Sequence, residues 1–390
     1  MIDTIRLEIR GLSPADIEAV KVKLDSHLVL ENETGLVRSE FTAGSLRGSW
    51  DSRISVQVRD YEFVALEQRE QRIKAIGCLS VVDCMSGPSM PHKVEADPYL
   101  VIEFSLPKWA EGVNFINSSL DLDLSRLVQF REWLVLKFGF DLPPLAEWLV
   151  KRVDIAYCFD MRSYHNILHY VKACRNLDFT RRKKPQFYQD SFFSSGSTTT
   201  LKAYAKETEF KKHDFKRIAL RFQDKFIAKQ VHELTKGLFR FEVEFKRRKL
   251  EQLQVFAIAD LSSIDWEKEM KTEIYKLIKG GKSGKVFKFT EVLQMLRTAD
   301  LKGKGITADS ASAIWSAIVL EGDKYAKAQF GARKYYRAMN VFKDLDITVL
   351  GLIQETKISP ILTEVNLIAH EVSNGDHLRK QYLSLFKKAA

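Results

Sequence analysis

Cysteine is scarce in this sequence, and the few cysteines present do not form close pairs. Cys78, Cys84, Cys158 and Cys174 are the only four among 390 residues. None belongs to a Cys-x-x-Cys pair and the spacings match no zinc pattern, so the sequence offers no zinc-ribbon or thioredoxin-like site. We expect four reduced thiols of a cytosolic protein, most of them packed in the interior.

Long apolar runs are also missing. No stretch approaches the roughly 20 apolar residues that a membrane-spanning helix needs. The first residues, Met1–Arg6, lack the charged-then-apolar pattern of a signal peptide. The sequence therefore predicts no membrane residence and a cytoplasmic location.

The composition points instead to a folded protein with a polyanionic partner. Hydrophobic residues make up 45% of the chain and charged residues 29%, as in ordinary globular proteins. The formal net charge is +10. An excess of this size favours nucleic acid as the partner, with an anionic membrane second. A length of 390 residues suggests two domains.

The stretch Thr200–Glu209 alternates like a strand and places a tyrosine between lysines. Lys202, Tyr204 and Lys206 would share one face, with Leu201 among the apolar residues of the other. A tyrosine hydroxyl can attack a phosphodiester, and neighbouring ammonium groups would stabilise the phenolate and the phosphate. The alternative is an amphipathic strand with a solvated cationic face.

Three further apolar segments carry charges inside them and are predicted as strands. They are Tyr99–Leu106, Trp148–Phe159 and Gly237–Lys249. An acid in such a strand is either an edge-strand surface residue or a buried site group. If the strands share one sheet, they bring acids and arginines to the strand of Tyr204: Glu103, Arg152, Asp154, Arg240, Glu242 and Glu244.

The other predicted elements follow from periodicity and capping residues. We expect a strand at Ile2–Ile9, a helix from Ser13–Pro14 to Leu24 or His27, and strands at Gly35–Phe41, Ser45–Trp50 and Ile54–Val58. A loop is expected at Cys84–Asp97, and helices at Leu120–Phe138, Ser163–Arg175, Lys216–Leu234 and Asp309–Leu320. In the helix Ser163–Arg175, His165 and His169 stand at i, i+4 and should lie side by side.

Two cationic segments are candidate DNA contacts. Arg181, Arg182, Lys183 and Lys184 precede an aromatic run, a combination typical of single-strand grooves, although a solvated loop would look the same. From about residue 249 the chain reads as helical. There, Gly331 separates two helices, and the second begins with Arg333, Lys334 and Arg337. This pattern fits a helix-turn-helix or a plain helical bundle.

Taken together, three motifs resemble the filamentous-phage gene II replication proteins, members of the CRI or gene II/X family of rolling-circle replication initiators. The motifs are Lys151–Ala156, Thr200–Glu209 and Gly237–Val243, in this order and spacing. The Met1–Asp3 start, Glu103–Lys108 and Tyr335–Arg337 with the following Asp346–Thr348 also fit. The resemblance spans most of the chain.

The resemblance implies an enzyme that nicks and rejoins one strand of phage or plasmid origin DNA. Tyr204 would become linked to the 5′ phosphate, and Arg152, Asp154, Lys206, Glu209, Arg240 and Glu242 match other family positions. Partners would be origin DNA, single-stranded at the nick with duplex flanks, a host helicase and a DNA polymerase in a bacterial cell. A homodimer is also compatible with this function.

The chain lacks the His-x-His strand with which wider rolling-circle nucleases hold their metal. Carboxylates would have to replace the imidazoles, and oxygen ligands suit Mg²⁺ or Mn²⁺. We therefore expect a metal site of Glu103, Asp154 and Glu242, with Glu209 as a further ligand. Lys206 and Arg240 would assist Tyr204 in catalysis. Arg152 and Lys202 join the two cationic segments as predicted DNA contacts.

The sequence thus predicts an α+β protein with two domains. Residues 1–250 would form a nicking domain on an antiparallel-rich sheet with flanking helices, and residues 251–390 a mostly helical, DNA-binding domain. Two interpretations without this chemistry stay open at this point: a non-catalytic DNA-binding regulator of replication, and an RNA-binding protein that uses the same basic and aromatic segment.

Overall fold

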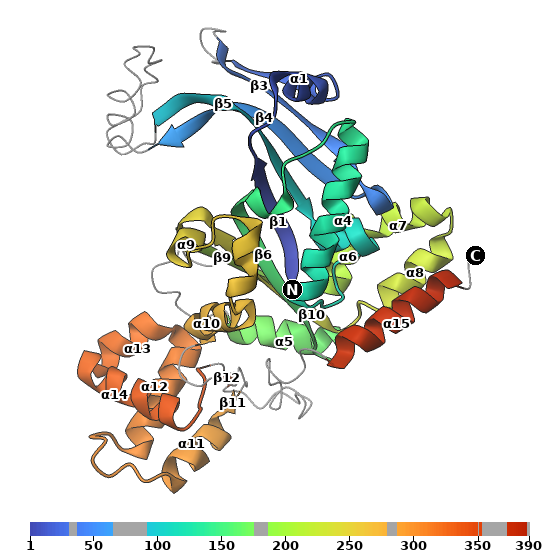
Figure 1. The fold of residues 1–390 in the computed structure, drawn as a ribbon. Helices are drawn as coiled ribbons and strands as arrows, with labels where there is room; N and C mark the ends of the chain where they lie inside the picture. The colour runs from blue at the N-terminus through green and yellow to red at the C-terminus, as the bar shows by residue number, and fades with distance from the viewer. Residues whose placement is uncertain are drawn as a thin grey trace.

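The computed structural model describes residues 1–30, 37–64, 92–174, 186–278, 287–349, 351–352 and 373–387, and it confirms the α+β class. One ten-stranded sheet organises the molecule, and every neighbouring pair in it is antiparallel. The strand order is β2-β3-β4-β5-β1-β6-β10-β9-β8-β7 (Figure 1). The strands are β1 (Ile2–Ile9), β2 (Asp25–Leu30), β3 (Val37–Arg47), β4 (Arg53–Val64), β5 (His92–Ser105), β6 (Leu149–Asp160), β7 (Gln186–Phe187), β8 (Ser191–Ser195), β9 (Thr199–Ala205) and β10 (Leu238–Lys246).

One face of the sheet is apolar across its central strands. The register joins Phe104 of β5 to Ile5 of β1, Ile5 to Val153 of β6, and Val153 to Phe245 of β10. All four side chains are buried. Helices that pack on this face include α4 (Leu120–Phe138), whose Phe130 stacks on Phe104 at 3.8 Å, and α5 (Tyr164–Cys174).

At one end of the opposite face lies a second core. This core is built from the segment after α3 (Leu106–Glu111), from α6 (Lys206–His213), α7 (Phe215–Phe222) and α8 (Lys225–Glu233), and from α15 (Ser373–Lys387). Phe115 and Phe210 meet at its centre, and Tyr382 of α15 donates a hydrogen bond to the Glu111 carbonyl at 2.6 Å. In Figure 1, α7, α8 and α15 lie together at the right of the molecule.

The part of the chain beyond residue 247 is mostly helical, as predicted. It contains α9 (Arg247–Gln252), α10 (Trp266–Ile278), α11 (Phe289–Thr298), α12 (Ala308–Glu321), α13 (Asp323–Phe330) and α14 (Ala332–Asp344), with a small parallel pair β11 (Phe287–Lys288) and β12 (Gly351–Leu352). Trp266 packs on Phe245 of the sheet at 5.4 Å, and Thr199 donates to Glu273 at 2.8 Å. The division at residue 250 stays a prediction.

Several predicted elements are confirmed: β1, the long helix α4, β6, β10, and the α13–Gly331–α14 helix pair. The first helix begins as expected, since Ser13 accepts from the Asp16 amide while Asp16 caps the Ser13 amide. It ends earlier than predicted, because α1 (Pro14–Lys21) gives way to strand β2 at Asp25.

Other predicted boundaries were wrong. The expected strands at Gly35–Phe41 and Ser45–Trp50 are largely one strand, β3, followed by a short helical turn at Ser49–Asp51. Residues 92–97 of the expected loop belong to the long strand β5. The expected helix Lys216–Leu234 is two helices, α7 and α8, since Gln223 between them adopts a left-handed φ of 52°. Of the cysteines, Cys158 and Cys174 are free and buried, while Cys78 and Cys84 lie outside the described residues.

Candidate active site

The polar face of the central strands gathers the predicted site residues in rows. Arg240 on β10 lies opposite Tyr204 on β9, and Glu242 lies opposite Lys202. One row further, Glu244 lies opposite Asp154 of β6. The prediction that these charged strands share one sheet is therefore confirmed, and β6, β10 and β9 are immediate neighbours.

The strand is shorter than the predicted stretch Thr200–Glu209, because β9 ends at Ala205. Lys206 is the first residue of α6 and not the last of a strand face. Its side chain is nevertheless close to the tyrosine, because Lys206 Nζ lies 6.0 Å from the centre of the Tyr204 ring. The lysine is completely buried.

A cluster of charges occupies the open part of this face. We call it the carboxylate cluster; it consists of Glu103, Arg152, Asp154, Lys202, Glu242 and Glu244. Arg152 binds both Asp154 oxygens, at 2.7 and 2.5 Å, and reaches Glu103 at 3.2 Å and Glu244 at 3.3 Å. Lys202 Nζ lies 2.6 Å from Glu242, 3.6 Å from Asp154 and 3.7 Å from Glu244. Each of the four acids therefore lies within ion-pair distance of at least one of these two cations.

Two cations, Arg152 and Lys202, lie among the four carboxylates. Further cations reach the cluster from outside: Arg6 lies 3.8 Å from Glu103, Lys246 lies 4.0 Å from Glu244, and Arg240 lies 4.0 Å from Glu242. Asp154 has no exposed surface. Burial, and then the neighbouring Glu242, raise the pKa of Asp154 to about 7, although the hydrogen bonds from Arg152 oppose the rise.

Tyr204 stands beside this cluster and is half-buried. Its hydroxyl donates a hydrogen bond to Glu242 Oε2 at 3.2 Å. Burial and the negative charge of Glu242 raise the pKa of Tyr204 well above its ordinary value. The hydroxyl is therefore protonated at rest, and a carboxylate is already in place to accept its proton.

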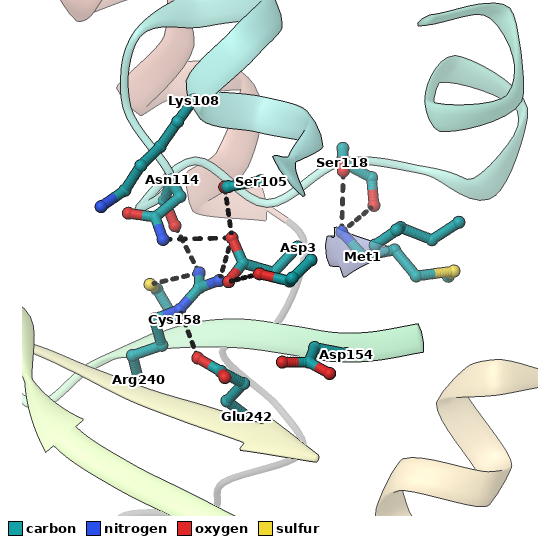
Figure 2. Close-up of polar contacts among 12 residues, drawn as sticks. Met1, Asp3, Ser105, Lys108, Asn114, Ser118, Asp154, Cys158, Arg240 and Glu242 are labelled. Atoms are coloured by element: carbon teal, nitrogen blue, oxygen red, sulfur yellow. Dashed lines mark hydrogen bonds and ion pairs between the residues drawn. The ribbon is translucent and has the colours of Figure 1, made fainter. Parts of the chain in front are cut away.

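On the other side of Glu242, a buried arginine is held by residues far apart in the chain. Arg240 Nη2 lies 3.0 Å from Asp3 Oδ1, and its Nη1 donates to the Asn114 carbonyl. Its Nε faces Glu242 Oε2 at 4.0 Å, so Arg240 lies between Asp3 and Glu242 (Figure 2). Asp3 also accepts from Asn114 and Ser105, each at 3.1 Å. Although burial acts in the opposite direction, Arg240 holds the pKa of Asp3 well below its usual range.

Glu209 belongs to a separate group beneath Tyr204. Lys206 donates to Glu209 and, at 2.6 Å, to Asn114 Oδ1. Lys108 reaches Glu209 at 3.5 Å and the buried Asp214 at 3.0 Å. Two lysines therefore compensate Glu209. Burial alone would raise the pKa of Glu209, but the positive charges of Lys206 and Lys108 hold it below its usual range.

Sequence reasoning missed Asp3, Lys108, Asn114 and Asp214. Asp3 had a usable signal, because it is an acid inside an apolar strand, as Glu103 and Asp154 are. Asn114 lies in an irregular segment with no periodicity, and only the folded chain brings it to Arg240 and Lys206. No local pattern could have assigned it.

The predicted metal ligands fit a divalent cation in chemistry but are not assembled as a metal site. Their oxygen donors suit Mg²⁺ or Mn²⁺. Lys202 and Arg152, however, stand between the carboxylates, and Glu209 contacts Lys206 and Lys108 instead. Over the residues that the structure describes, no group of three or more His, Cys, Asp or Glu side chains is arranged to hold a metal.

The predicted DNA contacts fall in three places. Arg152 and Lys202 are within the carboxylate cluster. Arg181, Arg182, Lys183 and Lys184 lie outside the described residues. In α14, Arg333 and Lys334 are exposed, whereas Arg337 is half-buried and donates to the Gly305 carbonyl at 2.9 Å.

The two histidines predicted to lie side by side do so. His165 Nε2 and His169 Nε2 are 2.8 Å apart on α5, and both residues lie at the surface. Burial lowers the pKa of His169, and the neighbouring His165 lowers it further. Neither contacts the carboxylate cluster in any hydrogen bond or ion pair that joins the described residues.

Comparison with protein families identifies the chain at the level of family. Residues 1–273 match the family model of the phage CRI proteins, which describes the N-terminal part of a replication-associated protein. The chain belongs to this family. The match includes all ten strands of the main sheet, the carboxylate cluster and Tyr204. It gives replication of a phage as the coarse function.

Two further comparisons found no match, since neither a curated protein nor a solved structure proved similar to the chain. As for membranes, none of the helices in the described ranges is long and apolar enough to cross a bilayer.

Proposed function

We propose that this CRI-family protein nicks and rejoins one strand of phage origin DNA and so starts rolling-circle replication. The observation that carries the proposal is the Tyr204 hydroxyl, which donates to the buried Glu242 carboxylate at 3.2 Å. A nucleophile and a base within hydrogen-bond reach of each other are what covalent catalysis requires. Family membership supplies DNA as the substrate class.

In the proposed reaction, Tyr204 Oη attacks the scissile phosphorus while Glu242 takes the hydroxyl proton. An Oη–P bond forms and the P–O3′ bond breaks, leaving the 5′ phosphate on Tyr204 and a free 3′ end. The departing 3′ oxygen takes up one proton, which balances the proton that Glu242 has accepted. Because the new phosphodiester keeps the bond energy, a 3′-hydroxyl can attack it and the strand can be rejoined.

The elevated pKa of Tyr204 explains why the base must be so close. Burial makes a free phenolate unfavourable, so proton transfer to Glu242 has to accompany attack. Nearby cations would offset the charge that develops on the phosphate. Lys202 Nζ lies 2.6 Å from Glu242, and Arg240 Nε lies 4.0 Å from it. When Glu242 takes the proton and becomes neutral, the positive charge of both side chains is left to act on the phosphate.

A divalent metal remains part of the proposal as a prediction. Asp154, Glu242 and Glu244 lie within 3.7 Å of Lys202 Nζ and are the residues that would hold such an ion. When bound, such an ion would neutralise phosphate charge. Asp154→Asn should then raise the Mg²⁺ or Mn²⁺ concentration needed for nicking, and Mn²⁺ binding measured by electron spin resonance should weaken in parallel.

The decisive experiment compares Tyr204→Phe with wild type on supercoiled origin DNA. The substitution removes one oxygen, so DNA affinity should be retained while nicking and the covalent adduct disappear. Tyr325→Phe is the matched control, because Tyr325 is 49% exposed on α13, whereas Tyr188 and Tyr157 are the next candidates for the nucleophile. Mass spectrometry of the DNA-linked peptide should identify residue 204. Nicking by Tyr204→Phe at the wild-type rate would exclude this nucleophile.

A second variant tests the base. Glu242→Gln keeps the shape of the side chain and removes its ability to accept a proton. Loss of nicking should fall within the range of about 10²–10⁴-fold that general base catalysis contributes. Wild-type protein that binds the origin but never cuts it would favour the alternative, a non-catalytic regulator of replication.

A further inference from the structure

The helices that follow Tyr204 carry a cationic surface that no sequence motif indicated. Six side chains of α6, α7 and α8 are exposed and have no acidic partner within ion-pair distance in the described part of the chain: Lys211, Lys212, Lys216, Arg221, Lys225 and Lys229. They leave a positive charge that suits a polyanion.

The acids of these helices do not neutralise this surface. Asp214 is buried and holds Lys108 and Arg217, and Asp224 accepts from the Phe226 amide as the cap of α8. Glu209 pairs with Lys206, and Glu233 pairs with Lys236. Of the acids between positions 206 and 233, this leaves only Glu207, which is half-buried.

Two large apolar side chains stand exposed where α7 turns into α8. Leu220 is 66% exposed and Phe226 is 63% exposed. Arg221 and Lys225 lie between them in sequence, and the chain reverses at Gln223. These four residues, Leu220, Arg221, Lys225 and Phe226, form what we call the helix-pair tip: apolar side chains flanked by cations.

The tip is rigidly attached to the body that holds the active site. Arg217 of α7 donates to the Trp50 carbonyl at 2.8 Å and to the Gly112 carbonyl, and it binds Asp214 at 2.9 Å. The Phe222 ring lies 5.8 Å from the Trp50 ring. On the other side, α6 continues directly from the strand of Tyr204. The tip is therefore attached to the body of the protein next to the strand that carries Tyr204.

We propose that the helix-pair tip binds duplex DNA and inserts Leu220 and Phe226 between base pairs, which separates the strand to be cut. Apolar side chains inserted between base pairs are a known means of unstacking a duplex. Arg221 and Lys225 would hold the adjacent phosphates. The inference rests on the proposed function and extends it, because Tyr204 can receive a single strand only after the duplex has opened.

Opening can be measured without cleavage. All proteins carry Tyr204→Phe, and an origin duplex labelled with 2-aminopurine reports unstacking by fluorescence. The added change Leu220→Ala/Phe226→Ala should keep duplex affinity nearly unchanged and abolish most of the fluorescence rise. Leu136→Ala is the matched control, because Leu136 is 83% exposed on α4 and belongs to no proposed surface.

The cations of the tip are tested in the same background by the salt dependence of binding. Arg221→Ala/Lys225→Ala should weaken duplex binding and flatten the slope of log affinity against log salt by about two units, one per phosphate contact. Lys268→Ala, an exposed cation on α10, should leave the slope unchanged.

The outcomes separate this inference from the proposed chemistry. Fluorescence that rises equally with and without Leu220 and Phe226 would overturn the wedge, even if Tyr204 is the nucleophile. An unchanged salt slope in the cation variant would assign the tip to another partner and also overturn it. If the tip variants lose opening while wild-type protein proves unable to nick, the wedge stands and the nuclease proposal fails.

Discussion

Asp154 provides a test of the electrostatics of the carboxylate cluster through Asp154→Asn. The aspartate is completely buried, and its pKa of about 7 lies far above the ordinary value of 3.8. The folded protein therefore binds this proton more tightly than the unfolded chain does. Stability that comes from the protonated form is present at low pH and is lost as pH rises towards 7. The asparagine variant has no such proton and should not show this loss.

The magnitude follows from the two pKa values. Between about pH 5 and about pH 7 the unfolded chain has already lost the Asp154 proton almost completely, whereas the folded protein keeps it until about half is released near pH 7. Each pKa unit corresponds to about 1.4 kcal/mol, so the wild-type protein should lose about 2 kcal/mol more stability than Asp154→Asn over this interval. Other titrating groups are common to both proteins and cancel in the difference.

Guanidinium unfolding of both proteins at several pH values measures this difference directly. The wild-type and variant midpoints should converge or cross as pH rises, with the variant gaining relative stability. Parallel pH profiles would refute the reasoning. They would show that Arg152 and Lys202 keep Asp154 ionised throughout, so that the cluster carries its full negative charge at neutral pH.

The remaining predictions concern binding and the buried arginine. Arg333→Ala/Lys334→Ala/Arg337→Ala should weaken duplex-origin binding and flatten the salt slope by about two units, since Arg337 already donates to a carbonyl; cleavage of a single-stranded origin oligonucleotide should persist. Alanines at Arg181–Lys184 should do the reverse, impairing oligonucleotide cleavage more than duplex binding, and equal losses in both assays would contradict this division. Asp3→Asn leaves the buried guanidinium of β10 without its counter-charge and should destabilise the fold by about 3–5 kcal/mol in chemical denaturation; unchanged stability would show that Asn114 and Glu242 suffice.

Local pattern alone was enough to predict the strands that build the site. In β10, phenylalanines and valine alternate with Arg240, Glu242 and Glu244. Because alternate residues of a strand lie on opposite faces, only a strand can bury the apolar set on one face and keep the charged set on the other. The same alternation identified Tyr204 and Lys202 as neighbours on one face. Because each of these strands has one apolar and one charged face, the sequence also favoured their lying in one sheet. Family resemblance added the role of Tyr204, which the alternation could not supply.

Only the tertiary structure decided which charges meet. Cross-strand register places Glu242 against Tyr204 and Lys202, and no property of either strand in isolation specifies that register. Asp3 and Asn114 reach Arg240 across 237 and 126 residues of chain, by way of the central position of β1 and an irregular segment. The cations that pair with the expected metal ligands can likewise be read from the sequence, but their pairing with those acids cannot.

The helix-pair tip shows the same limit for surfaces. Its sequence is that of an amphipathic helix, and we predicted one helix from Lys216 to Leu234. The break is made by Gln223, a non-glycine residue in a left-handed conformation that the sequence does not mark, although Asp224, the cap of α8, was a usable signal for a second helix start. Composition determined that this protein is basic and folded, because those properties are sums over residues. Which cations stay unpaired, and which apolar side chains stay exposed beside them, depends on contacts between segments distant in the chain and is decided only when the chain has folded.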